Sequence, residues 1–382
     1  MVHRLLFFIF LISSGCGVQS TFINSNYHSV LPYVSQDSVS QTIFLIGDAG
    51  EPVSKGTEPT FRILTQQALQ RPSVSTIIFL GDNIYPRGLP ESNAPERKEM
   101  ERRLNEQIGI AVLSGAGAIF IPGNHDWEYQ GKNGRRALLR EEEYIASQHH
   151  PNVTLLPKQG SPGPAVVDID DVRIVAIDTQ WWLHPFDKPL YPDDTSEIQT
   201  KKRFIDSLSR VLNAPQPRNI IVVAHHPLET YGEHGGFFDW KDHLFPLRKV
   251  ASWLWIPLPG IGSLYPLSRM WGISDQDLSG RRNIEMRSAL DSVISHSYAL
   301  AYAAGHEHVL EVLAKSAKQY LLVSGKGIQK HSEALTTGEQ TIFASRRQGF
   351  MRLDFLKNGN VRLGVTDTSE GEGREIFSMM LR

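Results

Sequence analysis

The chain has 382 residues, of which 41% are hydrophobic and 21% are charged, so it is long and apolar enough to form a folded core. Lysine and arginine number 39 against 41 aspartates and glutamates, giving a net charge of −2. This balance argues against a nucleic-acid-binding protein, because such proteins carry a basic excess. The single cysteine, Cys16, excludes an internal disulfide framework and a cysteine-rich zinc site. Histidines must therefore supply any soft metal ligands.

The N-terminal segment is typical of an export signal. A basic start, eight apolar residues from Leu5 to Ile12 and several small residues precede Cys16. The apolar run is too short to cross a bilayer. A cysteine after small residues resembles a bacterial lipoprotein cleavage site, although Ser13 stands where that pattern prefers leucine. We predict a signal peptide over residues 1–16, with either a lipid on Cys16 or plain secretion, and a polar linker over residues 17–40.

Short apolar runs rich in β-branched residues alternate with helical patterns along the rest of the chain. We predict buried strands at residues 41–47, 76–81, 118–123, 172–178, 219–225 and 299–305. Helical spacing of apolar residues covers residues 96–113, 196–212 and 279–294. This alternation indicates a layered α/β fold in one domain over residues 41–382. We expect the C-terminal runs to complete a second sheet, at residues 320–324, 341–344, 349–356 and 361–366.

Five of the predicted strands end in residues that can bind metals. In an α/β sheet, ligands gather outside the carboxyl ends of the strands, so these five ends have a physical reason to converge. One Gly-Asp or one His-x-His would be weak evidence, but five such ends in one chain are hard to obtain by chance. The five are Gly47-Asp48-Ala49-Gly50, Gly81-Asp82-Asn83-Ile84-Tyr85, Gly123-Asn124-His125-Asp126, Ala224-His225-His226 and Gly305-His306-Glu307-His308.

These side chains include the kinds of ligand that a two-metal site needs. Two cations about 4 Å apart need a shared oxygen ligand, and a carboxylate can supply it through its two oxygens. Imidazoles and hard oxygen ligands suit ions such as zinc and iron. The sequence provides both kinds, in Asp48, Asp82, Asn124, His225, His306 and His308.

The set of motifs resembles the calcineurin-like metallophosphoesterases and, among them, the purple acid phosphatases. The broad superfamily opens with Asp-x-His, whereas this chain has Asp48-Ala49-Gly50 and instead has Tyr85 in its second motif, as purple acid phosphatases do. The resemblance implies a two-sheet β-sandwich flanked by helices, in four α/β/β/α layers. It also implies two metal ions, Fe(III) and a divalent iron, zinc or manganese ion. One would take Asp48, Asp82, Tyr85 and His308, and the other Asp82, Asn124, His225 and His306.

Two further histidines are candidate catalytic residues by the same resemblance. His125 directly follows Asn124, and His234 lies nine residues after His225. Either could hydrogen-bond a phosphoryl oxygen or protonate the leaving alkoxide. The implied reaction is attack on phosphorus by a metal-bound hydroxide, without a phosphoenzyme. A solvent-exposed loop is the competing interpretation of His234.

The stretch between the fourth and fifth motifs contains an insertion at about residues 237–280. Its residues 250–268 have no charge, but their prolines and glycines make a membrane-spanning helix improbable. One interpretation is a loop packed beside the active site. The other is a substrate lid or a surface that enters the lipid interface, since tryptophan and tyrosine are enriched there.

The sequence thus predicts an exported phosphatase that acts on small phosphate monoesters in a bacterial cell envelope. A phosphodiesterase or nucleotidase with the same metals remains open, as does a catalytically silent envelope binding protein. Membrane association through a lipidated Cys16 and the 250–268 loop is left open, and no nucleic-acid partner is expected. The oligomeric state is left open.

Overall fold

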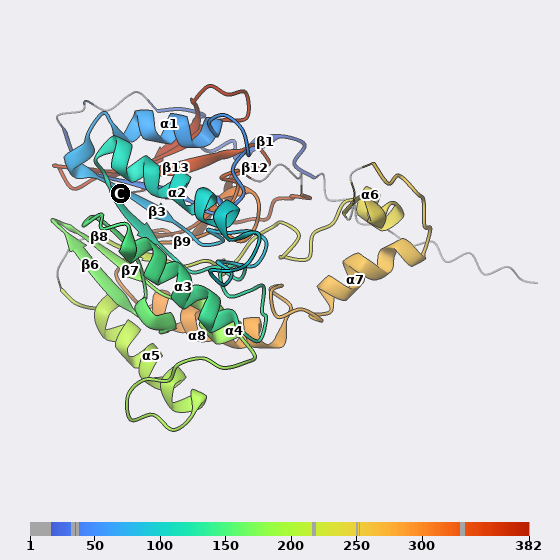
Figure 1. The fold of residues 1–382 in the computed structure, drawn as a ribbon. Coiled ribbons are helices and arrows are strands. Elements are labelled where there is room, and N and C mark those ends of the chain that lie inside the picture. The colour runs from blue at the N-terminus through green and yellow to red at the C-terminus, as the bar shows by residue number, and fades with distance from the viewer. Residues whose placement is uncertain are drawn as a thin grey trace, which may run out of the picture.

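The computed structural model describes residues 17–31, 35, 38–215, 219–249, 251, 253–328 and 333–381. Within these residues the chain forms two mixed β-sheets, with helices over the outer face of each (Figure 1). The predicted four-layer α/β/β/α fold is confirmed. The predicted signal peptide and Cys16 lie outside the described residues.

The first sheet, in the described part of the chain, has eight strands in the order β1, β12, β10, β11, β9, β8, β7 and β6. Parallel pairing joins β7, β8, β9 and β11 in its interior. The strands are β1 (Thr21–Ile23), β6 (Ala165–Ile169), β7 (Val172–Ala176), β8 (Asn219–Val223), β9 (Ala299–Ala304), β10 (Leu310–Ser316), β11 (Gln319–Ser324) and β12 (Thr341–Ser345).

The second sheet has seven strands among the described residues, in the order β15, β14, β13, β2, β3, β4 and β5. The four strands β2 to β5 pair in parallel, and the three C-terminal strands continue the sheet in antiparallel fashion. The strands are β2 (Val39–Ile46), β3 (Ser75–Phe79), β4 (Gly117–Phe120), β5 (Val153–Leu155), β13 (Gly349–Leu356), β14 (Val361–Asp367) and β15 (Arg374–Met380).

The core lies on both faces of the sheets, which explains the continuous apolar runs in the sequence. Along β2, Ile43 and Leu45 pack in the cluster between the sheets, whereas Phe44 and Ile46 pack in the cluster that includes the helices. Alternate side chains of a strand point to opposite faces, so a strand buried on both sides must be apolar at every position.

The helices cover the outer faces as the predicted layers require. In Figure 1, α1, α2 and α3 lie over the second sheet, and α4, α5 and α8 lie over the first. Within α5, Ser196 caps the N-terminus, because its side chain accepts a hydrogen bond from the Gln199 backbone N–H. The helices are α1 (Pro59–Ala68), α2 (Arg97–Ser114), α3 (Gly134–Ser147), α4 (Thr179–Leu183), α5 (Glu197–Leu212), α6 (Trp240–Leu244), α7 (Leu264–Met270) and α8 (Arg281–Ile294).

Two sequence predictions differ from the structure. The C-terminal runs complete the second sheet only in part: β13, β14 and β15 extend it, whereas β11 and β12 join the first sheet. Residues 21–23, inside the predicted linker, form β1 on β12, and Val18 is buried beside it. A strand of three residues is too short to produce a periodic pattern, so the polar composition around it concealed it.

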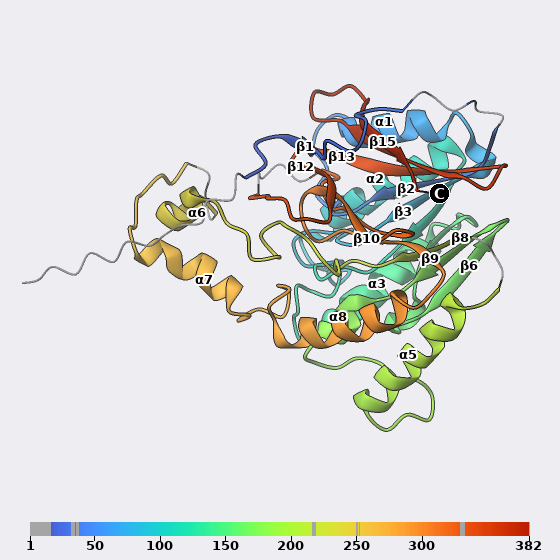
Figure 2. The same cartoon turned by 180° about the vertical axis from the view of Figure 1, so that it is seen from behind.

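The segment in which the sequence predicts an insertion forms an arm that projects from the two-sheet body (Figures 1 and 2). We call residues 237–273 the arm; it contains α6 and α7. Residues 274–280 return to the body and lead into α8. Among the described helices, none is both long enough and apolar enough to span a bilayer.

Candidate metal centre

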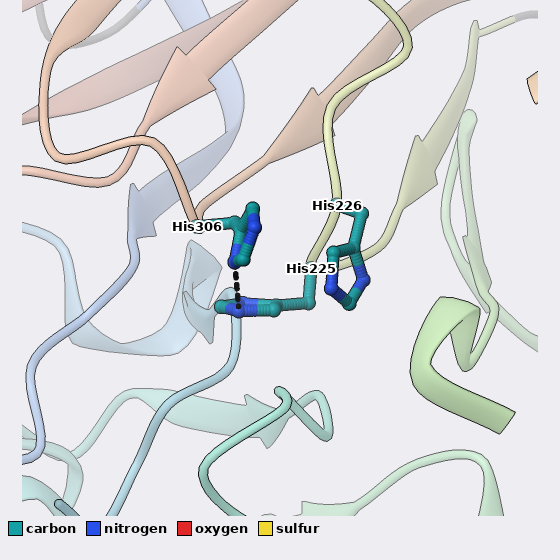
Figure 3. Close-up of side chains that lie close together, drawn as sticks. All are labelled: His225, His226 and His306. Atoms are coloured by element: carbon teal, nitrogen blue, oxygen red, sulfur yellow. Dashed lines mark hydrogen bonds between the residues drawn. The ribbon is translucent and has the colours of Figure 1, made fainter. Parts of the chain in front are cut away.

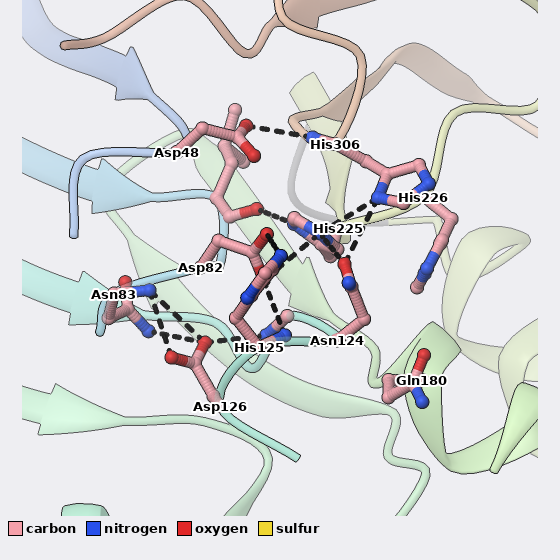
Figure 4. Close-up of polar contacts among 12 residues, drawn as sticks. Asp48, Asp82, Asn83, Asn124, His125, Asp126, Gln180, His225, His226 and His306 are labelled. Carbon is pink, nitrogen blue, oxygen red and sulfur yellow. Dashed lines mark hydrogen bonds and ion pairs between the residues drawn. The ribbon is translucent and has the colours of Figure 1, made fainter. Parts of the chain in front are cut away.

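The loops that follow β2, β3, β4, β8 and β9 meet at one end of the sheets (Figure 4). Each loop contributes at least one polar side chain that is at most 4% exposed. Burying so many polar groups is costly unless they pair with one another or with an ion. The structure thus brings together the strand-end residues singled out in the sequence: Asp48, Asp82, Asn124, His225 and His306.

The backbone at three of these residues is strained. Asp48, Asp82 and His306 have φ values of 56°, 55° and 67°, in the left-handed region that favours glycine. Such conformations persist only where the surroundings enforce them, and they concentrate at functional sites. Gly81 also has no room for a side chain, since a Cβ there would lie 2.5 Å from Nδ1 of His225.

Four donor atoms form a first group, the Asn124 cluster. Nε2 of His225 lies 2.9 Å from Oδ1 of Asn124, 3.2 Å from Nδ1 of His306 and 3.4 Å from Oδ1 of Asp82. Nδ1 of His306 lies 3.1 Å from the same Asn124 oxygen. Ligand atoms about 2.1 Å from a tetrahedral ion lie about 3.4 Å from one another. The spacing therefore suits one ion at the middle of the cluster.

Three donor atoms form a second group, the Tyr85 cluster. Oη of Tyr85 lies 3.0 Å from Oδ1 of Asp48 and 3.3 Å from Nε2 of His308, and that nitrogen is 3.3 Å from the Asp48 oxygen. Asp82 lies between the clusters, because ligand atoms of Asp48, Asp82 and His225 all lie within 4.8 Å of one another. A carboxylate in this position can serve two ions.

The electrostatics of both clusters favour bound cations. Burial, and then the charges of Asp48 and Asp82, raise the pKa of the Tyr85 hydroxyl well above its usual value, so a phenolate here needs a positive partner. Burial opposes ionisation of Asp82, but the neighbouring His225 and His125 lower its pKa overall. Burial lowers the pKa of His306, which keeps this imidazole in the neutral form that binds metals.

His225 shows what a bound cation would replace. Burial alone would lower its pKa, but the charges of Asp82 and Asp48 raise it to about 9. The protonated imidazole then balances the buried carboxylates. A metal ion can supply the same positive charge, and its binding would release this proton.

Each histidine of the two clusters is oriented by a contact on its other nitrogen. Nδ1 of His225 is 2.8 Å from the Leu80 carbonyl oxygen, and Nδ1 of His308 is 2.7 Å from Oε1 of Glu333. Nε2 of His306 is 2.9 Å from the carbonyl oxygen of Gln276. Such contacts select the tautomer and direct the free nitrogen toward the ion. Glu333 and Gln276 were missed in the sequence, where no motif or spacing marks them.

The two candidate catalytic histidines lie beside different ligands. Nε2 of His125 is 3.8 Å from Oδ2 of Asp82, and its Nδ1 is 2.6 Å from the Pro86 carbonyl oxygen. The ring of His234 lies 3.9 Å from that of His306, centroid to centroid. The structure therefore places both next to the clusters, and His234 is not in a solvent-exposed loop: its side chain is 17% exposed.

Two neighbouring residues support the site without facing it. His226 groups with His225 and His306 (Figure 3), but its Nδ1 contacts Thr179 Oγ1 at 2.8 Å and its Nε2 contacts Gln276 Oε1 at 2.9 Å. Both nitrogens are thus engaged away from an ion. Asp126 accepts hydrogen bonds from the backbone N–H groups of residues 83, 84 and 123 (Figure 4). It joins two ligand-bearing loops.

Comparison with known proteins supports this assignment of fold. A family model described as calcineurin-like phosphoesterase matches residues 41–254, more than half of the chain. No curated protein sequence matches.

Solved structures with a similar fold include GAP50, the anchor in the inner membrane complex of Plasmodium, with a TM-score of 0.52, 16% identity and 89% of each chain covered. A purple acid phosphatase from yellow lupin seeds has a TM-score of 0.52 and 16% identity, over 91% of this chain and 55% of that one. A dimetal phosphatase from Danio rerio has a TM-score of 0.45 and 15% identity, over 90% and 99% of the two chains. At 16% identity, the two structures with a TM-score of 0.52 indicate a common fold alone.

Proposed function

Because the chain belongs to the calcineurin-like phosphoesterase family, we propose that it is a metal-dependent hydrolase of phosphate monoesters. The observation that supports this most directly is the pair of donor clusters with the Asp82 carboxylate between them. Five unrelated turns would not be expected to produce two complete half-sites at one sheet edge.

Each ion of the proposed centre has its own ligands and shares Asp82. The Tyr85 cluster would hold Fe(III), since a phenolate is a hard, charged ligand, and the Asn124 cluster would hold a divalent iron, zinc or manganese ion. When bound, the two ions supply Lewis-acid stabilisation of phosphoryl charge and a water of lowered pKa. The proposed ligands are Asp48, Asp82, Tyr85 and His308 for the first ion, and Asp82, Asn124, His225 and His306 for the second.

The two remaining histidines would act on the substrate. His125 and His234 have side chains 19% and 17% exposed, so both can be reached from solvent. Each lies beside a proposed ligand, and each imidazole can donate a hydrogen bond to a phosphoryl oxygen when its Nε2 is protonated. The one nearer the leaving group would return a proton to the departing alkoxide.

The same site could act on phosphodiesters or nucleotides, because the shape of the pocket around the ions decides between these substrates. A catalytically silent protein is the less favoured candidate. All the donor positions are occupied by suitable side chains, and their orienting contacts are present as well.

We also propose that the protein is exported to a bacterial cell envelope. The support is the basic, apolar and small-residue pattern of residues 1–16, with Cys16 as the site of lipid attachment. With β1 and Val18 packed on the body, any linker would be shorter than the predicted 17–40 segment.

The test of function is hydrolysis of p-nitrophenyl phosphate and bis-p-nitrophenyl phosphate side by side, with protein loaded with iron and zinc. Faster turnover of the monoester is expected. Preference for the diester would move the function to phosphodiesterase chemistry. No turnover of either ester, with both metals shown to be bound, would contradict the proposal.

The iron assignment has a separate test in Tyr85→Phe. An Fe(III)–phenolate pair absorbs visible light by charge transfer, so the loaded protein should be coloured and the variant should lose this band. Tyr129→Phe, which changes an exposed tyrosine nearby, is the matched control and should keep the band. An unchanged spectrum in Tyr85→Phe would reject Tyr85 as an iron ligand.

A further inference from the structure

The arm exposes an unusual set of aromatic side chains. The protein has seven tryptophans, and the three in the body, Trp127, Trp181 and Trp182, are at most 4% exposed. The other four all lie in the arm and are 52% to 76% exposed: Trp240, Trp253, Trp255 and Trp271. Water-exposed tryptophan is therefore confined to one projecting segment of the molecule.

Aliphatic side chains extend this apolar surface. Five more large hydrophobic residues of the arm are 46% to 77% exposed, namely Ile256, Ile261, Leu264, Met270 and Ile273. The segment between α6 and α7 forms the far end of the arm (Figures 1 and 2). Exposed apolar groups gathered in this way mark a binding surface more often than scattered single residues do.

The polar groups of the arm suit a lipid interface. Its charged residues are four basic and two acidic, so it is cationic although the whole chain is slightly acidic. Lys241 and Arg248 pair with no carboxylate among the described residues. They lie over tryptophan rings, with Arg248 4.1 Å from the centroid of Trp255. Long basic side chains beside tryptophans are typical of the headgroup region of a bilayer.

Val18 lies close to the residues that lead into the arm. The Val18 backbone N–H donates to the Leu335 carbonyl oxygen at 2.8 Å, and Leu335 forms a β-bridge with Gly232, shortly before the arm begins. The chain before Gly17 includes the apolar run from Leu5 to Ile12. Val18, which follows this run in the sequence, thus lies close to the residues that lead into the arm.

We propose that the arm docks on a lipid bilayer with anionic headgroups, placing its tryptophans in the interfacial region. The charge of the arm favours an anionic surface over a neutral one. The short helices α6 and α7 fit a segment that lies in the interface and does not cross the membrane. Docking needs no hydrolysis, so its test does not depend on the proposed activity.

The experiment uses the full chain and vesicles of phosphatidylcholine and phosphatidylglycerol with brominated acyl chains. Bromine quenches tryptophan only at close range, and the body tryptophans are buried, so quenching reports the arm itself. We expect quenching and a blue shift with these vesicles. Sedimentation with vesicles without quenching would overturn the proposal, because the N-terminal segment alone would then be the anchor.

Variants separate the aromatic and basic contributions. Trp253→Ser with Trp255→Ser should weaken vesicle binding by about tenfold, since apolar burial drives interfacial binding. Ile198→Ser with Tyr298→Ser, at residues 79% and 66% exposed on the body, is the matched control and should bind as the wild type does. Lys241→Gln with Arg248→Gln should weaken binding to anionic vesicles by about 25-fold.

A second copy of the chain is the alternative occupant of this surface. If the arm joins two copies, its tryptophans will become protected from iodide as protein concentration rises without any lipid. That result, together with no quenching by brominated vesicles, would overturn the lipid proposal in favour of a dimer.

A second inference rests on a different observation, the contact between His234 and Arg269, which lies near the C-terminal end of the arm. Nδ1 of His234 is 3.0 Å from Oδ1 of Asp277 and 2.9 Å from Nη2 of Arg269. Nε of Arg269 also donates to both Asp277 oxygens, at 2.8 and 2.7 Å. Asp277 is 1% exposed, so this ion pair is shielded from solvent.

Two contacts compete for Nδ1 of His234. The Asp277 carboxylate only accepts, so its contact requires a proton on Nδ1, whereas the Arg269 guanidinium only donates, so its contact requires a lone pair there. Both contacts hold the ring at Nδ1, which leaves Nε2 as the nitrogen that can face a substrate oxygen. We infer that Asp277, acting through Arg269, is a positioning residue for His234, an inference that rests on the proposed function.

Asp277→Asn removes the charge that holds Arg269 in place. We expect a fall in kcat of about tenfold with KM and metal content unchanged, in the range typical of one general acid–base contact. The effect should disappear in a His234→Ala background, because both changes act through one group. Asp275→Asn, two residues away and facing Arg282, is the matched control. Additive losses in the double variant would contradict the inference.

Nitrogen-15 NMR of the His234 imidazole gives a readout that needs no turnover. Asp277→Asn changes the partner of Nδ1, so the ratio of the two His234 tautomers should differ between the wild type and this variant. An identical spectrum in the two proteins would overturn the positioning role. Absence of turnover in the wild type with the expected spectra would instead contradict the proposed function.

Discussion

The two-sheet body and the arm use the same kinds of residue in opposite ways. In the body, Phe343 and Phe377 stack between the sheets at 4.9 Å and are fully buried. In the arm, Trp253 is 76% exposed. Burial of an aromatic side chain stabilises a fold, whereas exposure of one stabilises nothing until a partner covers it. The difference indicates that body aromatics serve the fold and arm aromatics serve an encounter with another surface.

Polar groups show the reverse contrast. The body buries Asp48, Asp82 and His225 almost completely, and strained backbone holds two of them at the ends of strands. The arm contributes Arg269, which contacts both Asp277 and His234. The body therefore supplies the ligands of the candidate metal centre, and Arg269 of the arm contacts His234 beside them.

The largest expected effect comes from the carboxylate between the two clusters. Asp82→Asn keeps the shape of the side chain but removes the charge shared by both ions. Loss of one preorganised charged contact costs on the order of 10³-fold in kcat/KM. Turnover of p-nitrophenyl phosphate and metal content by mass spectrometry would measure it. Asp187→Asn, at a side chain 80% exposed, is the control. Wild-type-like turnover in Asp82→Asn would defeat the assignment of the site.

Replacing a buried aromatic residue of the body and an exposed one of the arm with alanine tests whether the two regions use aromatic residues differently. Phe343→Ala should lower the free energy of unfolding by about 3 to 5 kcal/mol, because it leaves a cavity between the sheets. Trp253→Ala should change it by no more than about 0.5 kcal/mol, since its side chain is exposed. Denaturant midpoints would measure both. If Trp253→Ala destabilised the body as much as Phe343→Ala, the arm would have to be part of the core.

A smaller effect is expected at the contact that orients His308. Glu333→Gln should weaken binding of the ion in the Tyr85 cluster by about 10- to 100-fold, as loss of a carboxylate partner of a metal-binding histidine does. Competition with a chelator, followed by metal analysis, would measure it. Glu339→Gln, an exposed position in the same region, serves as the control. Equal affinities in the two variants would mean that Glu333 does not orient the ligand.

The smallest effect concerns helix caps in the two regions. Asp239 caps α6 through the N–H groups of Lys241 and Asp242, and Ser196 caps α5 in the body. Replacing either cap with alanine should cost about 1 kcal/mol. Hydrogen exchange should speed up only within the arm for Asp239→Ala, whereas Ser196→Ala should lower the stability of the whole body. Faster exchange across the body in Asp239→Ala would show that the arm unfolds together with it.

The sequence predicted the parts of the fold whose causes are local. The strands that supply ligands were predicted to within a few residues, because each is a continuous apolar run ending at glycine or histidine, as from Ile43 to Gly47. The helix over residues 196–212 was predicted because its cap and its apolar spacing agree. The sequence could not predict which sheet each C-terminal strand joins, since strand pairing depends on contacts distant in the chain.

By itself, then, the sequence determined the identity and order of the candidate ligands, because the order of strands and their terminal residues is a one-dimensional property. Only the tertiary structure decided the contacts around them. Glu333 lies 25 residues from His308, and Gln276 lies 30 residues before His306, with no spacing rule to relate them. The exposure of the arm was decided in the same way. An uncharged, tryptophan-rich segment can pack on a body or project from it, and its sequence is compatible with both until the neighbouring surfaces are known.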